Sequence, residues 1–313
     1  MLGFATARDY LSYVLRLKAS IMTLRSFTIA VVVGLGLNMG AVAAQDVPAG
    51  NVQQTAPLTR PDTRILGATL MIGDIIAVMR EEGLVHGTTL ADDLFPGQGG
   101  ARWQAVVQQI YDTAEMERAF GDAFAQELSV AAPEEIAAMQ AFFGSDQGQQ
   151  ILTLELEARR ALLDDAVEDA AKLAVEDMVA DRDPRMELLR RFATANDLIE
   201  SNVMGALNSN FAFYRGMAEV GGFGDMTEAD MLADVWSQEA DIRSETEDWL
   251  FPYLALAYQP LDQDDLEAYL AFSETEAGQK LNAALFAAYD VVFSRISLDL
   301  GRAAARQMQG EDI

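Results

Sequence analysis

Hydrophobic side chains recur at steps of three and four residues through most of this chain, the spacing that gathers them on one face of an α-helix. The first such stretch begins near Pro61 and stops at Gly83; it carries Ile65, Leu66, Leu70, Ile72, Ile76 and Met79. Short helices are expected over residues 89–94 and 101–111, because the proline and glycines of residues 95–100 interrupt a helix. No stretch alternates as a strand does, so the pattern predicts an all-α fold.

Capping residues mark where the later helices should begin. Asp112 with Glu115, and Thr227 with Asp230, have the spacing of a capping box. Other predicted starts are Pro133, Ser145, Asp262 and Thr275, since proline suits a first turn and the others accept from exposed amides.

Two helix ends are also predicted. The helix that starts at Ser145 should run to about Asp181, where the turn of residues 181–184 ends it. The helix that starts at Thr227 should continue toward Leu250, with Pro252 bending or breaking it.

One sequence motif occurs twice in the chain, and all matched positions are 130 residues apart. Residues 135–151 and 265–281 share an acidic-aliphatic pair, a phenylalanine, a hydroxyl residue three before a glycine, and a glutamine. The matched pairs are Phe142 and Phe272, Ser145 and Thr275, Gly148 and Gly278, and Gln149 and Gln279. This spacing predicts two copies of one unit: a short helix, a tight turn and a long helix.

The repeat predicts an antiparallel helical bundle built from two helix-hairpin units, over residues 61–182 and 183–313. In each copy the hydroxyl group should cap the long helix. The glycine one turn later costs about 1 kcal/mol of helix propensity relative to alanine, so we expect a close contact with the preceding helix there. The motif is therefore interpreted as a packing device.

These residues resemble a known family. Glu135-Ile136, Phe142-Phe143 and Ser145-x-x-Gly148-Gln149 are similar to the signature of DUF2059, and the second copy is similar more loosely. Asp146 and Glu276 stand where the family often has proline, and Ser273 replaces the second aromatic residue. The resemblance covers roughly 50 residues around each copy. It implies a helical domain of an exported bacterial protein and supplies no catalytic residues.

The N-terminus has the order of features of a signal peptide. Arg25 precedes the uncharged residues 27–37, and small residues follow at Ala41, Ala43 and Ala44. We expect residues 1–44 to be removed after Ala43 or Ala44, with Met22 as an alternative start, and residues 45–60 to form a disordered linker. An uncleaved membrane anchor is the alternative. The predicted location is the periplasm or the medium, without a stable membrane anchor.

Charge limits the partners. The formal net charge is −27, and because the first 44 residues carry +3, the rest carries −30. Such a body repels phosphate backbones and anionic headgroups, which argues against nucleic acid binding and electrostatic membrane docking. The chain has no cysteine, which excludes a disulfide or a lipid-modified N-terminal cysteine.

No catalytic, cofactor or metal motif is found. His86 is the only histidine, is expected in a loop beyond a helix end, and lacks the spacing of a helical metal site. Motifs of triad hydrolases, phosphate-binding loops and penicillin-recognising enzymes are absent from the sequence. Among the 49 acidic residues, the noticeable groups are interpreted as solvated surface and caps: Glu155 and Glu157, and Asp262, Asp264 and Asp265.

Two stretches combine aromatic and arginine residues with glycine-rich segments. They are Arg102 and Trp103 after residues 95–100, and Phe211, Phe213 and Tyr214 before residues 221–224. Such groups often mark binding surfaces. The alternative is a helix connection whose aromatic residues are buried in the core.

The function predicted from these features is a non-enzymatic, exported helical module that binds an unknown protein or envelope partner, with no cofactor. Two alternatives remain. One is a carrier with an apolar cavity lined by Phe211, Phe213, Tyr214 and Met217. The other is a carboxylate-dependent hydrolase of cell-wall glycan, since such enzymes need only two acids.

Overall fold

The computed structural model describes residues 60–222 and 226–310, and every regular element within these ranges is a helix. The first part contains α2 (Arg60–Thr69), α3 (Ile72–Leu94), α4 (Ala101–Ile110), α5 (Thr113–Glu127), η2 (Leu128–Val130), α6 (Pro133–Phe143), α7 (Asp146–Ala161) and α8 (Asp165–Ala180). The second contains α9 (Pro184–Ala195), α10 (Leu198–Glu219), α11 (Glu228–Trp236), α12 (Glu239–Tyr258), α13 (Gln263–Ser273) and α14 (Glu276–Gln309). The predicted all-α class is confirmed. The predicted export signal and all but the last residue of the predicted linker lie outside the described residues.

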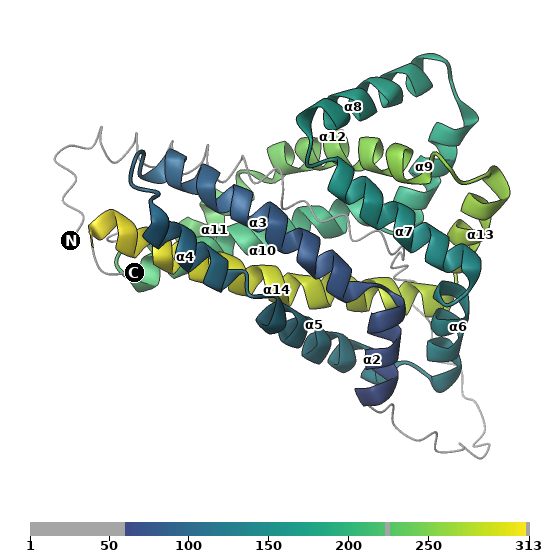
Figure 1. Ribbon diagram of the computed structural model, residues 1–313, viewed down its shortest axis with the longest axis horizontal. Helices are drawn as coiled ribbons and strands as arrows, with labels where there is room; N and C mark the ends of the chain where they lie inside the picture. Colours follow the sequence, from purple (N-terminus) through teal and green to yellow (C-terminus); the bar gives the residue numbers. More distant parts are fainter. Residues whose placement is uncertain (1–59, 223–225, 311–313) are drawn as a thin grey trace.

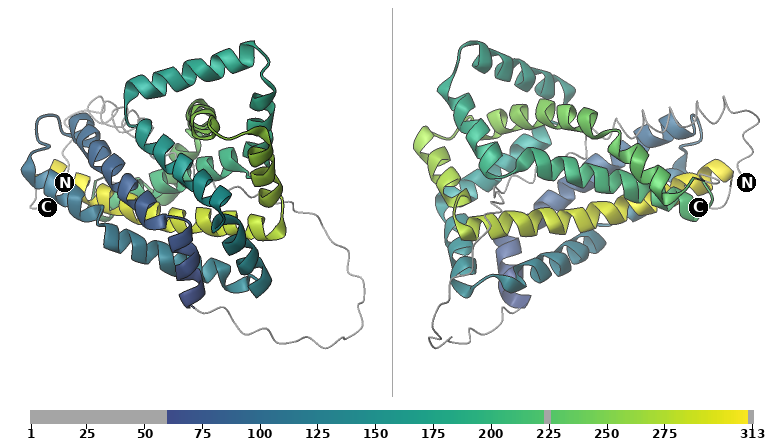
Figure 2. Two further views of the ribbon diagram at one scale, coloured as in Figure 1. Left: turned by 45° about the vertical axis from the view of Figure 1, so that its right-hand side comes forward. Right: turned by 180° about the vertical axis from the view of Figure 1, so that it is seen from behind.

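Helix α14 forms the centre of the molecule. It runs along most of the long axis, with α10 beside it and α5 below it (Figures 1 and 2). At the far end from the C-terminus, α6, α7, α9 and α13 gather, and α8 lies on the outer side of α12 (Figure 1). By length and composition α14 could also span a membrane, but more than half of its most apolar window is buried, as in the core helix of a soluble protein.

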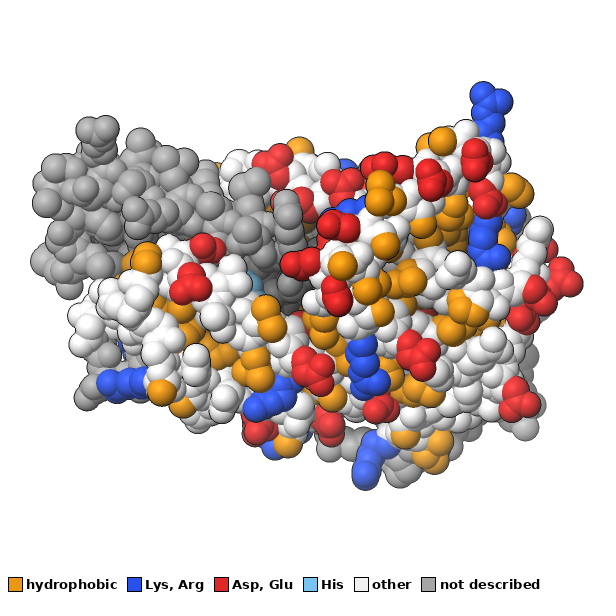
Figure 3. All heavy atoms as spheres, turned by 45° about the horizontal axis from the view of Figure 1, so that its top comes forward, with side chains coloured by type: hydrophobic (Ala, Val, Ile, Leu, Met, Phe, Trp, Pro, Cys, Tyr) orange, Lys and Arg blue, Asp and Glu red, His pale blue; other side chains and the backbone are white. Residues whose placement is uncertain are grey.

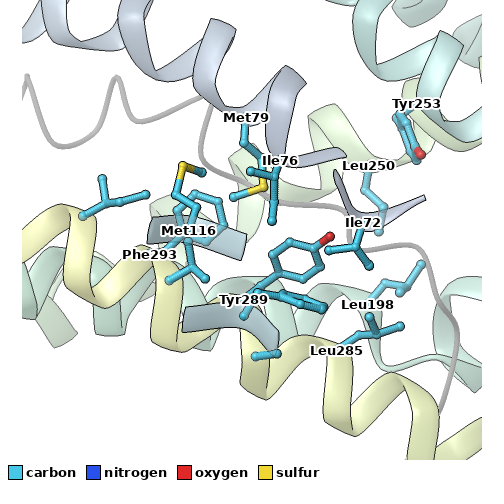
Figure 4. Close-up of a cluster of buried hydrophobic side chains, with 14 of the residues drawn as sticks. Ile72, Ile76, Met79, Met116, Leu198, Leu250, Tyr253, Leu285, Tyr289 and Phe293 are labelled. Atoms are coloured by element: carbon cyan, nitrogen blue, oxygen red, sulfur yellow. The ribbon is translucent and has the colours of Figure 1, made fainter. Parts of the chain in front are cut away.

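One hydrophobic core joins the two predicted units. Figure 4 shows buried side chains from both sides of residue 183 in contact around α14: Ile72, Ile76 and Met79 from α3, Met116 from α5, Leu198 from α10, Leu250 and Tyr253 from α12, and Leu285, Tyr289 and Phe293 from α14. These contacts give the two units a shared interior.

Two glycines allow α10 and α14 to touch backbone to backbone. A Cβ atom on Gly216 would overlap the carbonyl oxygen of Leu298, and one on Gly301 would overlap that of Phe213, both well under 3.0 Å. Further back, Asn208 of α10 donates to Asp290 Oδ1 of α14, and Asn282 of α14 donates to the carbonyl oxygen of Asn196 at the end of α9, each at 3.0 Å. Residue numbers rise together along both helices, so α10 and α14 run parallel.

The predicted helix stop at Gly83 is wrong. Helix α3 continues through Gly83 to Leu94 and includes the predicted short helix at residues 89–94. A Cβ atom at Gly83 would collide with the ring of Tyr111, so this glycine serves the packing of α3 against the end of α4. The real break comes earlier, at Met71, whose backbone is left-handed with φ of 55°.

Two other predicted helix ends are also wrong. The helix from Ser145 ends at Ala161, and α8 begins afresh after Asp164, whose carboxylate accepts from the amide of Ala166 at 2.9 Å. The helix from Thr227 ends at Trp236, and α12 then passes through Pro252. At this second break, buried Gln238 accepts a hydrogen bond from Asn210 of α10 at 3.1 Å. The first break is thus marked by a local cap, and the second by a contact with another helix.

The two hairpins related by the 130-residue offset have the same local geometry. The amides of Gly148 and Gly278 each donate at 3.0 Å to the hydroxyl oxygen of Ser145 or Thr275, which confirms both predicted caps. A Cβ atom on either glycine would overlap the carbonyl oxygen of the preceding phenylalanine, Phe142 or Phe272. The expected close helix contact is therefore present at both places, while a common origin of the two segments stays a prediction.

The hairpins face each other with reciprocal contacts. The rings of Phe142 and Phe272, which are equivalent positions, stack with centroids 4.3 Å apart. On one side Gln147 Nε2 donates to Asp265 Oδ1 at 2.7 Å, and on the other Lys280 Nζ donates to Glu135 Oε1 at 2.6 Å. In both cases a side chain near the start of a long helix contacts the acid at the start of the other short helix. The phenylalanines and the two acids are equivalent positions, whereas the counterparts of Gln147 and Lys280 at the 130-residue offset are Ala277 and Gln150.

Replacing Gly278 by alanine is expected to lower the free energy of unfolding by about 2 kcal/mol, because the added methyl group meets a backbone carbonyl rather than a flexible side chain. Thermal unfolding should show a midpoint several degrees lower. Gly121→Ala is the control: it adds the same methyl group to an exposed position of α5 with no atom within 4 Å, so it should raise the midpoint. An unchanged midpoint for Gly278→Ala would contradict the close contact.

Candidate functional site

The first predicted binding surface is largely part of the core. Trp103 is only 1% exposed, its Nε1 donates to the carbonyl oxygen of Gly87 at 2.7 Å, and its ring meets Phe95 edge to face. Arg102, next to it, is exposed on α4. The buried tryptophan therefore packs α4 against α3, as expected for a helix connection with aromatic residues in the core. Of the two residues, only Arg102 is accessible to solvent.

The second predicted surface is also mostly interior. Phe213, Tyr214 and Met217 are buried on the side of α10 that contacts the core, and Tyr214 Oη donates to Asp234 Oδ2 at 2.9 Å. Phe211 is half-buried. None of these four residues lines the groove described below, which lies beside α10.

His86 is placed differently from the prediction. It lies inside α3, 6% exposed, rather than in a loop beyond a helix end, because α3 continues past Gly83. Burial lowers the pKa of His86 from 6.5 to about 4, so its imidazole is neutral near pH 7. Within the described part of the chain, no group of three potential ligands could hold a metal ion.

A buried ion pair connects α3 to α7. The guanidinium group of Arg159 donates from Nε and from its second terminal nitrogen to the two carboxylate oxygens of Glu82, at 2.8 and 2.7 Å. Both residues are almost fully buried. Burial alone would lower the pKa of Arg159, but the charge and hydrogen bonds of Glu82 raise it instead. This pair is a fixed, two-point link between the helices.

Glu155, interpreted from sequence as solvated surface, is instead a core residue. Its Oε1 accepts from Tyr258 Oη at 2.8 Å and from Tyr269 Oη at 3.2 Å, while Tyr253 Oη donates to its backbone carbonyl at 3.2 Å. Burial raises the pKa of Glu155 from 4.5 to about 8, partly offset by the two tyrosine hydroxyls. Glu157, by contrast, is exposed as expected, and Asp262 caps α13 through the amide of Asp265.

The most site-like feature is a groove between α10 and α14, with a volume of about 280 Å³. Its apolar walls come from Met204 and Ala206 of α10 and from Phe286, Ala287 and Phe293 of α14. The helices touch at Gly216 and Gly301, which lie C-terminal to the groove-lining residues of α10 and α14. N-terminal to those residues, the side chain of Asn282 donates to Asn196 O. We call this feature the α10–α14 groove.

Carboxylates are the charged groups of the groove. Asp197, Glu200 and Asp290 line it, together with uncharged Ser201, Asn202, Asn208 and Ser209. Glu200 is balanced by Arg243 at 2.7 Å. Asp290 is half-buried, accepts one hydrogen bond from Asn208 and forms no ion pair with any described residue. Burial raises the pKa of Asp290 above its usual value, and the bond from Asn208 offsets part of this shift.

The face formed by the top of the molecule carries scattered carboxylates with separate hydrophobic side chains between them (Figure 3). A second hollow, between α8 and α12, is lined by several carboxylates, among them Glu168, Glu245 and Asp248. The exposed large hydrophobic residues belong to several helices, among them Val85 of α3, Leu173 of α8 and Trp236 of α11.

The sequence interpretation did not find the groove or the buried ionisable groups. One signal was available for the groove: Gly205 lies in the middle of an otherwise regular helix, next to Met204 and Ala206. No signal marked Glu82, Arg159 or Glu155, because a carboxylate on a helix is usually solvated. Their burial depends on side chains that other helices supply.

The comparison with known families agrees with the residues that carried the resemblance. A family model described as an uncharacterized protein conserved in bacteria, DUF2059, matches residues 114–177. This segment is of the DUF2059 type. It extends from α5 through most of α8 and contains the first hairpin with Glu155 and Arg159. The DUF2059 match does not extend to the second hairpin or to the α10–α14 groove. No curated protein and no solved structure shows a significant match to the chain.

Proposed function

We propose that the protein is exported to the periplasm and acts there as a non-enzymatic binding protein that holds a small ligand in the α10–α14 groove. The observation that carries this proposal is the groove itself, an open, mainly apolar site beside a well-filled core. Ligand sites typically combine apolar walls with a few polar groups, as here. The carrier hypothesis is therefore favoured over a scaffold for a protein partner. The groove is lined by other residues of α10 than those suggested by the sequence.

Export is supported by the sequence. Arg25, the uncharged residues 27–37 and the alanines at 41, 43 and 44 have the order of a cleavable signal. The absence of cysteine from the sequence is compatible with an oxidising compartment. The net charge of −27 makes nucleic acid and anionic membrane surfaces poor partners.

Expression in a bacterium with a periplasm, followed by fractionation, should place the chain in the periplasm with a new N-terminus at Ala44 or Gln45. Native mass spectrometry of that material should show an additional small mass that is lost on unfolding. Cytoplasmic protein of uncleaved mass would contradict export. A periplasmic protein without any bound mass would contradict the carrier function while leaving export supported.

A carboxylate-dependent glycan hydrolase is the second candidate. Asp197 and Asp290 both line the groove, and burial raises the pKa of each. A glycosidase uses one carboxyl group kept protonated and a second that is ionised. Incubation with peptidoglycan followed by muropeptide analysis separates the two functions: release that disappears in Asp290→Asn would support the enzyme, and unchanged peptidoglycan would contradict it.

A further inference from the structure

The α10–α14 groove has features that select among ligands, and this inference rests on the proposed binding function. Its volume of about 280 Å³ lies near the lower end of ligand pockets, so the ligand is small. The rings of Phe286 and Phe293 and the thioether of Met204 offer surfaces for an apolar body. Aromatic faces also attract cations through their negative quadrupole.

The charge of the groove is complementary to a cation. Its lining within the described residues contains three carboxylates and no lysine, arginine or histidine. Of the three, Glu200 is already paired with Arg243, which also binds Glu239. Asp290 sits half-buried between the helices with only the amide of Asn208 as a partner, and a partly desolvated carboxylate without a counter-ion is unfavourable. A bound cation would supply that counter-ion.

Gly205 keeps the groove open. It lies in the interior of α10, where glycine weakens a helix relative to alanine, and no atom lies within 4 Å of where its Cβ would be. Packing therefore does not require glycine here, in contrast to Gly216 on the same helix, where a Cβ would strike the backbone of α14. A side chain at position 205 would instead occupy space beside the groove.

We propose that the α10–α14 groove binds a small organic cation, an ammonium group attached to an apolar body, with the ammonium at Asp290 and the apolar part against Phe286 and Phe293. Gly205 is a specificity-determining position, because a larger residue there would exclude the ligand. Inorganic cations fit the site poorly, since no group of three potential ligands in the described residues could hold a metal ion.

The test uses isothermal titration of the mature protein, in phosphate buffer without organic amines, with three probes that share one ring. 2-Phenylethylammonium should bind with saturation, 2-phenylethanol at least tenfold more weakly, and phenylacetate not detectably. Asp290→Asn should reduce the affinity for the cation at least tenfold, because it removes the charge and keeps the shape of the side chain.

Gly205→Leu should abolish binding of the cation while the protein stays folded, with a thermal midpoint equal to or above that of the wild type. The matched control is Gly121→Leu, which adds the same side chain at an unobstructed glycine of α5 and should leave binding unchanged. Cation binding that survives both Gly205→Leu and Asp290→Asn, or no cation binding to the wild type at millimolar concentration, would overturn the inference. Equal binding of the neutral and cationic probes, abolished by Gly205→Leu, would overturn the cation preference alone and leave the proposed binding function standing.

Discussion

Replacing Arg159 by methionine is expected to lower the free energy of unfolding by about 3–5 kcal/mol near neutral pH. The reason is the state of Glu82 in the variant. In the native protein both of its carboxylate oxygens are bound by Arg159, at 2.8 and 2.7 Å, and neither side chain has appreciable contact with solvent. Removing the arginine leaves an uncompensated negative charge between α3 and α7. Urea unfolding followed by circular dichroism measures the effect.

One control separates the effect of an unpaired buried charge from a simple loss of packing. The double variant Glu82→Leu with Arg159→Met removes both charges and should recover most of the stability, since well-packed apolar residues often replace a buried ion pair without loss. A loss below about 1 kcal/mol in the single variant would show that the pair contributes little.

Replacing Glu155 by glutamine is expected to stabilise the protein above about pH 4.5, by about 3 kcal/mol at pH 7. The folded protein holds the pKa of this carboxyl group at about 8, whereas its ordinary value is 4.5. The folded state therefore binds the proton more tightly, so this stabilising contribution is complete below pH 4.5 and is lost as the pH rises through 8. Glutamine imitates the protonated form, because its amide oxygen can accept from Tyr258 and Tyr269 as Glu155 does.

The measurement is the free energy of unfolding in urea at several pH values. His86 acts in the opposite direction, since burial lowers its pKa from 6.5 to about 4 and its contribution is lost as the pH falls through that range. The contributions of these two groups should cancel between about pH 4.5 and 6.5 and leave a decline above it. Glu155→Gln should remove that decline, and Glu157→Gln, on the exposed side of α7, should not. If the free energy of unfolding of Glu155→Gln still declines above about pH 6.5, ionisation of Glu155 is not the cause of the decline.

Local features of the fold were predictable from the sequence. Helix starts at Asp112, Ser145, Thr227, Asp262 and Thr275 have the expected side-chain caps. A cap needs only residues within one turn, so the sequence around it contains the required information. The close contacts at Gly148 and Gly278 were predictable for the same reason, because the carbonyl groups they approach lie six residues earlier.

Features that depend on distant residues were not predictable. Gly83 looked like a helix stop, but it accommodates Tyr111 from another helix, and the break at Gln238 involves Asn210 of α10. Glu155 looked like a surface residue because the hydroxyls that bind it come from residues about 100 positions later in the chain. The α10–α14 groove likewise needs two helices whose parallel arrangement no local pattern indicates. Pairings between helices, rather than helix propensity, determine these parts of the structure.

The facing hairpins have a consequence for the symmetry of the molecule. A contact in which equivalent residues meet each other, here Phe142 and Phe272, is typical of the association of two identical subunits. Because both halves of this contact belong to one polypeptide, it does not depend on protein concentration, and its two sides are free to differ.

The two sides of this contact differ. Gln147 binds Asp265 and Lys280 binds Glu135, but the counterparts of Gln147 and Lys280 at the 130-residue offset are Ala277 and Gln150. The counterparts of Glu155 and Arg159 at the 130-residue offset are Leu285 and Tyr289. Two identical subunits would have to bury such ionisable side chains twice, whereas the single chain buries them once and fills the other half with uncharged residues.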